Sequence, residues 1–245
     1  MTTRTLGLLG GMSWQSTAVY YRLINEGVAR RLGGLHSAPL LLHSVDFAAI
    51  AALQAAADWS AAAGVLAAAA AGLKRAGAGA LVLATNTMHK AADRIETGGG
   101  LPLLHIADAT AAALQAAGVR HAALLGTRFT MTDRSIVADR LAGRHGLHVL
   151  HVSVPDEADR ELVHRVIYEE LCRGIVSAAS RAALLAVIER QRLLGATAVI
   201  LGCTELTLSL DAICSPLPVF DTTLLHATAA IDWLLDEQDP RGDTL

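Results

Sequence analysis

Two short polar motifs stand at equivalent places in the chain, each directly after an apolar run. Thr85-Asn86-Thr87 follows Ala80–Ala84, and Cys203-Thr204 follows Ala198–Gly202. A thiol can act as a general acid or base, and polar groups at the start of a helix bind carboxylates. Two such motifs that face each other across a cleft could move a proton from one side of a small molecule to the other.

The position of Cys203 predicts thiolate character. A cysteine at a strand end, followed by a helix N-terminus, has its negative form favoured and its pKa lowered. A free cysteine is also typical of a small buried hydrophobe. We interpret Cys172, in an amphipathic helix, and Cys214, in a loop, as structural. Asp108 and Asp221 are interpreted as helix N-caps rather than bases.

The elements that must position these motifs occur in two copies. Gly10, Thr85 and Asp108 recur as Gly126, Cys203 and Asp221 at nearly constant spacing, which indicates an internal duplication. Alternating strands and helices predict an α/β fold with two similar lobes, each a parallel sheet flanked by helices, related by pseudo-twofold symmetry. Ligands of such sheets bind beyond the carboxyl ends of the strands, so the motifs should converge on a cleft between the lobes.

The duplication also suggests where the lobes begin and end. We place an N-terminal α/β lobe at residues 1–118 and a C-terminal α/β lobe at 119–225. Residues 226–245 are expected to form a helix that packs back on the first lobe, with a frayed polar tail. Within the second lobe, the pattern predicts a strand at Leu147–Val152 and a helix at Val163–Cys172. The glycine turns after the first strand of each lobe are expected to admit a ligand close to the backbone.

Composition excludes several classes of protein. The 245 residues are 53% hydrophobic and 18% charged, which is typical of a globular chain. With a net charge of −3 and no basic run, the sequence carries no nucleic-acid footprint. No apolar stretch has membrane-spanning length, and without a signal-peptide pattern we expect a cytoplasmic protein. Three scattered cysteines and ten dispersed histidines predict neither a disulfide framework nor a metal site. The glycine pattern matches no dinucleotide fingerprint.

Four segments of the chain resemble the aspartate/glutamate racemase family, closest to its broad-specificity bacterial amino-acid racemases. They are Leu6–Trp14, Thr85–Lys90, Leu124–Met131 and Gly202–Glu205, and they occur in the family's order over nearly the whole chain. The resemblance implies a racemase without a cofactor, acting on a small-molecule amino acid. Two cysteines of the family act on opposite faces of the substrate Cα. Family members are often dimers, so the resemblance also implies a homodimer.

The family's first cysteine maps to Thr85 and its second to Cys203. A threonine hydroxyl is a far weaker acid than a thiol, so Cys203 can act as a base while Thr85 is a poor one. A related subgroup carries the same threonine and prefers L-substrates. The resemblance therefore implies that L-glutamate or L-aspartate reacts faster than the D-form, although the equilibrium constant between enantiomers stays at one.

The resemblance also implies substrate contacts, carried over motif by motif. These fall at Met12, Gln54, Asn86, Thr87, Thr127 and Thr204. Asn86, Thr87 and Thr204 would hold the α-carboxylate. Some aspartate racemases have a lysine near the place of Cys172, and here Arg173 is the expected substitute for holding the distal carboxylate. Cell-wall glutamate racemases have histidine where this chain has Glu205, so a role dedicated to peptidoglycan is disfavoured.

Two other hypotheses remain open at this point. One is another enzyme of the same superfamily, such as a hydantoin racemase or a maleate isomerase. A hydantoin has no free α-carboxylate, so its pocket should be more apolar. The other is a non-catalytic amino-acid-binding protein, because half of the proton-transfer pair is missing.

Overall fold

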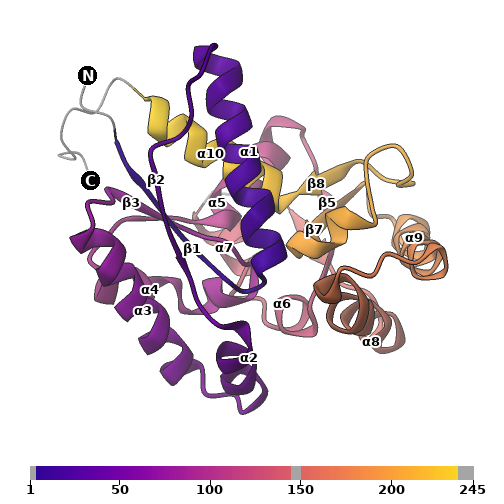
Figure 1. Cartoon of the computed structure of the whole chain (residues 1–245). Coiled ribbons are helices and arrows are strands. Elements are labelled where there is room, and N and C mark those ends of the chain that lie inside the picture. Colours follow the sequence, from indigo (N-terminus) through magenta and orange to yellow (C-terminus); the bar gives the residue numbers. More distant parts are fainter. Residues whose placement is uncertain (1–3, 145–149, 237–245) are drawn as a thin grey trace.

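Two four-stranded parallel sheets form the frame of the protein (Figure 1), in a computed structural model that describes residues 4–144 and 150–236. The strands are β1 (Leu6–Gly10), β2 (Leu40–Ser44), β3 (Ala80–Leu83), β4 (Leu103–Leu104), β5 (His121–Gly126), β6 (His151–Ser153), β7 (Ala198–Gly202) and β8 (Val219–Asp221). The first sheet has the order β2-β1-β3-β4 and the second has β6-β5-β7-β8. The two orders are equivalent, which confirms the predicted two-lobe α/β fold.

Helices connect the strands in both halves. The α-helices are α1 (Trp14–Leu32), α2 (Phe47–Ala55), α3 (Trp59–Arg75), α4 (Ala92–Gly99), α5 (Ile106–Ala116), α6 (Arg128–Thr132), α7 (Ala138–Arg144), α8 (Glu157–Arg165), α9 (Ala178–Leu193) and α10 (Thr222–Leu235). Four shorter helical segments are η1 (Thr87–Ala91), η2 (Val166–Glu170), η3 (Leu171–Arg173) and η4 (Thr204–Leu208). Among the described residues, no helix combines the length and the apolar content that a bilayer span requires.

Several local predictions are corrected. The helix expected at Val163–Cys172 is broken, because η2 is a π-helix and η3 a 3₁₀ helix. Of the strand expected at Leu147–Val152, positions up to 149 lie outside the described residues, and β6 begins at His151. Asp221 is the N-cap of α10 as predicted. Asp108 is not a cap, because it lies in the first turn of α5 and pairs with Arg140 at 2.7 Å.

The central strands are buried on both faces, as parallel strands between helices must be. Every residue of β1, β3 and β7 is buried. In Figure 1, α3 and α4 lie on one side of the first sheet, and α1 and α10 lie on the other. Helices pack on the two faces of the second sheet in the same way. In both sheets these helices cover the faces and not the carboxyl ends of the strands, where a site can form.

The last helix of each half covers the sheet of the other half. Leu114 of α5 packs in one cluster with Leu124 and Ile200 of the second sheet, although α5 precedes the predicted boundary at residue 118. Ile231 of α10 packs in one cluster with Leu8 of the first sheet. This exchange ties the two lobes together through their hydrophobic cores.

A pair of glycine-to-alanine variants tests the packing of α10 against α1. A Cβ on Gly27 would lie 2.2 Å from Ile231 Cδ1, whereas a Cβ on Gly64 in α3 meets nothing within 4 Å. Alanine favours a helix interior over glycine, so Gly64→Ala should raise the free energy of unfolding by about 0.5–1 kcal/mol. Gly27→Ala should lower the free energy of unfolding by about 1 kcal/mol, because the clash of the new methyl group with Ile231 outweighs the gain in helix propensity. Urea denaturation measures both, and equal shifts would contradict the packing described.

Candidate active site

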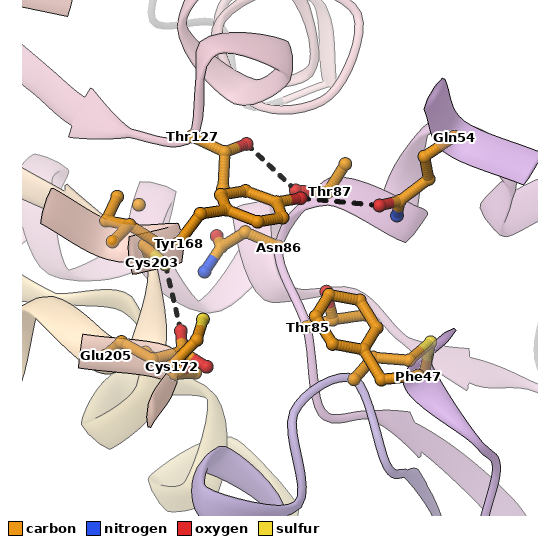
Figure 2. A pocket seen from close by; sticks show the side chains of 14 residues that line it. Phe47, Gln54, Thr85, Asn86, Thr87, Thr127, Tyr168, Cys172, Cys203 and Glu205 are labelled. Atoms are coloured by element: carbon orange, nitrogen blue, oxygen red, sulfur yellow. Dashed lines mark hydrogen bonds between the residues drawn. The ribbon is translucent and has the colours of Figure 1, made fainter. Parts of the chain in front are cut away.

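A narrow cavity lies between the lobes, next to the carboxyl ends of β3 and β7 (Figure 2). The two expected catalytic residues and the six substrate contacts carried over by motif all line it: Met12, Gln54, Thr85, Asn86, Thr87, Thr127, Cys203 and Thr204. The other lining residues are Phe47, Ile167, Tyr168, Cys172, Gly202 and Glu205. The structure therefore brings the two polar motifs together, with Thr85 and Cys203 in one cavity.

The glycine turns serve the packing of the chain. Gly11 has a φ of +92°, and a Cβ there would lie 2.1 Å from the carbonyl oxygen of Val45. A Cβ on Gly126 would lie 2.7 Å from the carbonyl oxygen of Gly202, its partner in the β5–β7 register. Neither Gly11 nor Gly126 lines the cavity. Neighbouring backbone fills the space beside both glycines, and the residues that follow them, Met12 and Thr127, line the cavity.

Glu205 is the centre of a buried hydrogen-bond network. Its Oε1 accepts hydrogen bonds from the hydroxyls of Ser13 and Ser16, each at 2.6 Å. Its Oε2 accepts from Thr204 Oγ1 at 2.7 Å and from Cys203 Sγ at 2.9 Å. A carboxylate can be buried only where such donors replace water. The serines belong to the first lobe and the other donors to the second, so this side chain links the lobes at the cavity wall.

The environment of Cys203 opposes thiolate formation. Burial raises the pKa of the Cys203 thiol well above its usual range, and the Glu205 carboxylate raises it further. The helix that follows is a 3₁₀ helix, Thr204–Leu208, and it does not offset these two effects. The predicted lowering of the pKa is therefore wrong. The thiol is a hydrogen-bond donor to Glu205, and a proton acceptor stands beside it.

A second set of hydrogen bonds crosses between the lobes at Asn86 and Thr87. Thr87 Oγ1 lies 3.1 Å from Thr127 Oγ1. Asn86 Nδ2 donates to Thr222 Oγ1 at 3.1 Å, and Thr222 in turn donates to the carbonyl oxygen of Leu201 at 2.7 Å. The Thr222 proton is thereby committed, which fixes the amide orientation of Asn86. Asn86 Oδ1 is buried without a partner among the described residues.

The orphan oxygen adds a second role to the one expected for Asn86. A buried acceptor without a partner is costly unless a ligand supplies a donor. The side-chain nitrogen of Asn86 donates one of its two hydrogens to Thr222 and keeps the other for a carboxylate oxygen. The free oxygen suits the ammonium group of an amino acid. Backbone N–H groups at the starts of η1 and η4 are further donors that suit the α-carboxylate.

Tyr168 reaches across the cavity from the second lobe. Its hydroxyl lies 3.5 Å from Gln54 Oε1, and its ring centroid lies 6.4 Å from that of Phe47 (Figure 2). Burial raises the pKa of the Tyr168 phenol, which keeps it a neutral donor. The π-helix η2 carries Tyr168, and such segments often occur at functional sites. A regular helical pattern in the sequence gave no sign of this bulge.

The neighbouring residues Cys172 and Arg173 differ from expectation. Cys172 is not only a packing residue, because it lines the cavity, and burial raises the pKa of its thiol. Arg173 is exposed and does not line the cavity. The expectation that Arg173 holds a distal carboxylate is therefore wrong. Among the residues that the structure describes, no group of His, Cys, Asp or Glu side chains could hold a metal ion.

His89 supports Thr85 from behind the cavity. Its Nδ1 lies 2.7 Å from the carbonyl oxygen of Thr85, and its Nε2 accepts a hydrogen bond from the backbone N–H of Ile106 at 3.3 Å. Burial lowers the pKa of this imidazole well below its usual value, so it is neutral. A neutral ring with a proton on Nδ1 satisfies both contacts. His89 therefore fixes the backbone that presents Thr85.

Comparison with known proteins places this fold and site. A family model described as Asp/Glu/Hydantoin racemase matches residues 9–230. A Yersinia pestis protein that carries the provisional name Asp/Glu racemase is 52% identical, with a TM-score of 0.86 over 95% of this chain and 100% of its own. An aspartate racemase homologue from Pyrococcus horikoshii OT3 is 29% identical, with a TM-score of 0.77 over 95% and 100%. Glutamate racemase from Francisella tularensis, solved with D-glutamate, shares the fold at 15% identity, with a TM-score of 0.64 over 96% and 82%.

The chain belongs to the Asp/Glu/hydantoin racemase family, as its motifs indicated. It is therefore an enzyme of the isomerase class, because the family that it belongs to is one of racemases. Glu205 is the one carboxylate among the described residues that line the cavity, and it contacts the thiol of Cys203.

Glu205→Gln should lower the pKa of the Cys203 thiol. The substitution keeps the shape of the side chain but removes the negative charge, which after burial is the largest cause of the raised pKa. Thiolate absorbance near 240 nm, titrated against pH and corrected with the same variant carrying Cys203→Ala, measures the change. An unchanged or higher pKa would show that burial alone governs this thiol.

Proposed function

We propose that the protein is a cofactor-independent racemase of acidic amino acids, with Cys203 and Thr85 on opposite faces of the substrate Cα. The observation that carries this proposal is that both side chains line one interlobe cavity, each directly after an equivalent strand. The names of the Yersinia and Pyrococcus relatives support glutamate and aspartate as substrates. The substrate is the only partner that the proposal requires.

Proton transfer begins at Cys203. Its thiol lies 2.9 Å from Glu205 Oε2, so the carboxylate can accept the thiol proton and leave a thiolate. The thiolate then takes the α-hydrogen from one face of the bound L-amino acid. The negative charge that develops spreads into the α-carboxylate, where helix-start N–H groups stabilise it. Asn86 Oδ1 accepts a hydrogen bond from the substrate ammonium group.

The second transfer takes place on the face of Thr85. The Thr85 hydroxyl donates a proton to the carbanion and is reprotonated from solvent, while Glu205 releases to solvent the proton that it took from the thiol. A hydroxyl is a much poorer base than a thiol, so abstraction from the D-isomer at this face is slow. Since the equilibrium constant between enantiomers is one, kcat/KM for racemisation is equal in both directions. The asymmetry must therefore appear as α-hydrogen exchange without inversion, because Cys203 can return a solvent proton to the same face.

Exchange of the α-hydrogen with D2O tests the role of Cys203. Reduced enzyme should exchange the α-hydrogen of L-glutamate or L-aspartate at least about tenfold faster than that of the D-isomer. Cys203→Ala should slow exchange of the L-isomer at least about 100-fold, because the base is lost. Proton NMR follows both reactions. No exchange with any acidic amino acid would favour a binding protein, and exchange of hydantoins alone would favour a hydantoin racemase.

Thr85→Cys tests the assignment of faces. A second thiol should raise exchange of the D-isomer at least about tenfold and reduce the asymmetry, because both faces then carry an effective base. Thr85→Ser is the matched control, since it differs from the cysteine variant in one atom and should leave D-exchange slow. If the cysteine and serine variants exchange D-glutamate at the same rate, Thr85 does not face its α-hydrogen.

A further inference from the structure

We propose that the enzyme also racemises amino acids with neutral amide side chains, and that it acts on L-glutamine faster than on L-glutamate. The inference rests on the proposed function, because it concerns the side-chain end of the same cavity. It goes beyond the acidic substrates that the relatives' names suggest. Three properties of the cavity wall carry it: its charge, its hydrogen-bonding groups and its enclosure.

The first property is the charge of the wall. Among the residues that line the cavity, the one charged side chain is Glu205, and it is negative. No described lysine, arginine or histidine lines the cavity, and Arg173, the nearest candidate in sequence, is exposed. Lys90, which follows the first polar motif, pairs with Asp133 outside the cavity. A distal carboxylate would therefore enter without a cation and in the presence of a buried carboxylate.

This charge balance separates the two substrate classes. Glutamate and glutamine share the α-carboxylate and the ammonium group, so the α-carbon end of the site treats them alike. At the distal end, an unpaired carboxylate suffers a much larger desolvation penalty than an amide, which is neutral. The repulsion from Glu205 applies to the carboxylate alone. The difference therefore acts on the distal group and favours the amide.

The second property is the pair of groups available to a distal substituent. Apart from the threonines, Asn86, the cysteines and Glu205, the polar side chains that line the cavity are Gln54 and Tyr168, which contact each other. Gln54 Nε2 donates to Met88 Sδ at 3.2 Å, so the oxygen of this amide faces the Tyr168 hydroxyl. Gln54 Oε1 thus offers an acceptor, and the Tyr168 hydroxyl beside it offers a donor. A primary amide matches both, whereas a carboxylate matches the donor and is repelled by the acceptor.

The third property is the enclosure of the cavity at Gln54 and Tyr168, where a weak contact between the two side chains is shielded from solvent. The distance of 3.5 Å between the Tyr168 hydroxyl and Gln54 Oε1 is at the long limit for a hydrogen bond. A substrate amide that inserts here exchanges one weak contact for two good ones. Gln54 and Tyr168 are both largely shielded from solvent, and Phe47 packs beside the tyrosine ring. Little water therefore remains to screen a charge at this position.

The test compares L-glutamine and L-glutamate with the same wild-type enzyme in D2O. Proton NMR gives kcat/KM for α-hydrogen exchange of each substrate. We expect the ratio of glutamine to glutamate to exceed one and to be about tenfold, which corresponds to about 1.4 kcal/mol. A ratio below one overturns the inference while leaving the proposed function intact. Exchange of neither substrate means that the proposed function itself has failed.

A charge introduced at Gln54 sharpens the comparison. Gln54→Lys places a cation beside the distal group and should shift the ratio at least about tenfold toward glutamate. Gln54→Met is the matched control, with an unbranched side chain of similar reach and no charge, and its ratio should stay above one. Equal ratios in the two variants would show that the distal group does not lie at Gln54. Should either variant fail to fold, the wild-type ratio decides the inference alone.

Discussion

The buried carboxylate of Glu205 is the interaction on which the site depends. It receives hydrogen bonds from Ser13 and Ser16 of one lobe and from Cys203 and Thr204 of the other. Removing these donors would leave an unpaired charge in the interior, which is strongly unfavourable. The lobes are therefore held in the one arrangement that satisfies this carboxylate. The same arrangement brings the cysteine into one cavity with Thr85 and places a proton acceptor beside the thiol.

The fold supports that geometry by sharing its two cores. Because α5 covers the second sheet and α10 covers the first, neither sheet is enclosed by its own half of the chain. Apolar burial thus holds the lobes together at the back of the cavity, while polar contacts hold them at its wall. The contacts at the wall are mostly hydroxyls, which can reorient their protons as charge moves in the cavity. The proposed transfer of protons between thiol, carboxylate and substrate would need this combination of a fixed frame and adjustable donors.

The sequence was informative where structure follows from local pattern. Apolar runs that end at polar motifs predicted the parallel strands, their duplication and the convergence of Thr85 and Cys203. The sequence did not predict the properties of the site that depend on contacts between residues far apart in the chain. The pKa of Cys203 follows from burial and from Glu205, and neither the burial nor the four donors around Glu205 can be seen in a chain segment. Tyr168 reaches the cavity through a π-helix, which a regular helical pattern conceals.

Arg173 is exposed, so the contact expected between it and a distal carboxylate is missing from this site. A family resemblance transfers a reaction through the residues that touch Cα, because those groups must stay in place for any substrate of the same type. The wall that meets the side chain is free to differ. Here that wall carries no cation among its described residues and presents a neutral donor beside a neutral acceptor, Tyr168 and Gln54. The chemistry at Cα and the choice of side chain are thus set by separate parts of one cavity. The electrostatics of the wall, rather than the family name, decides between an acid and an amide.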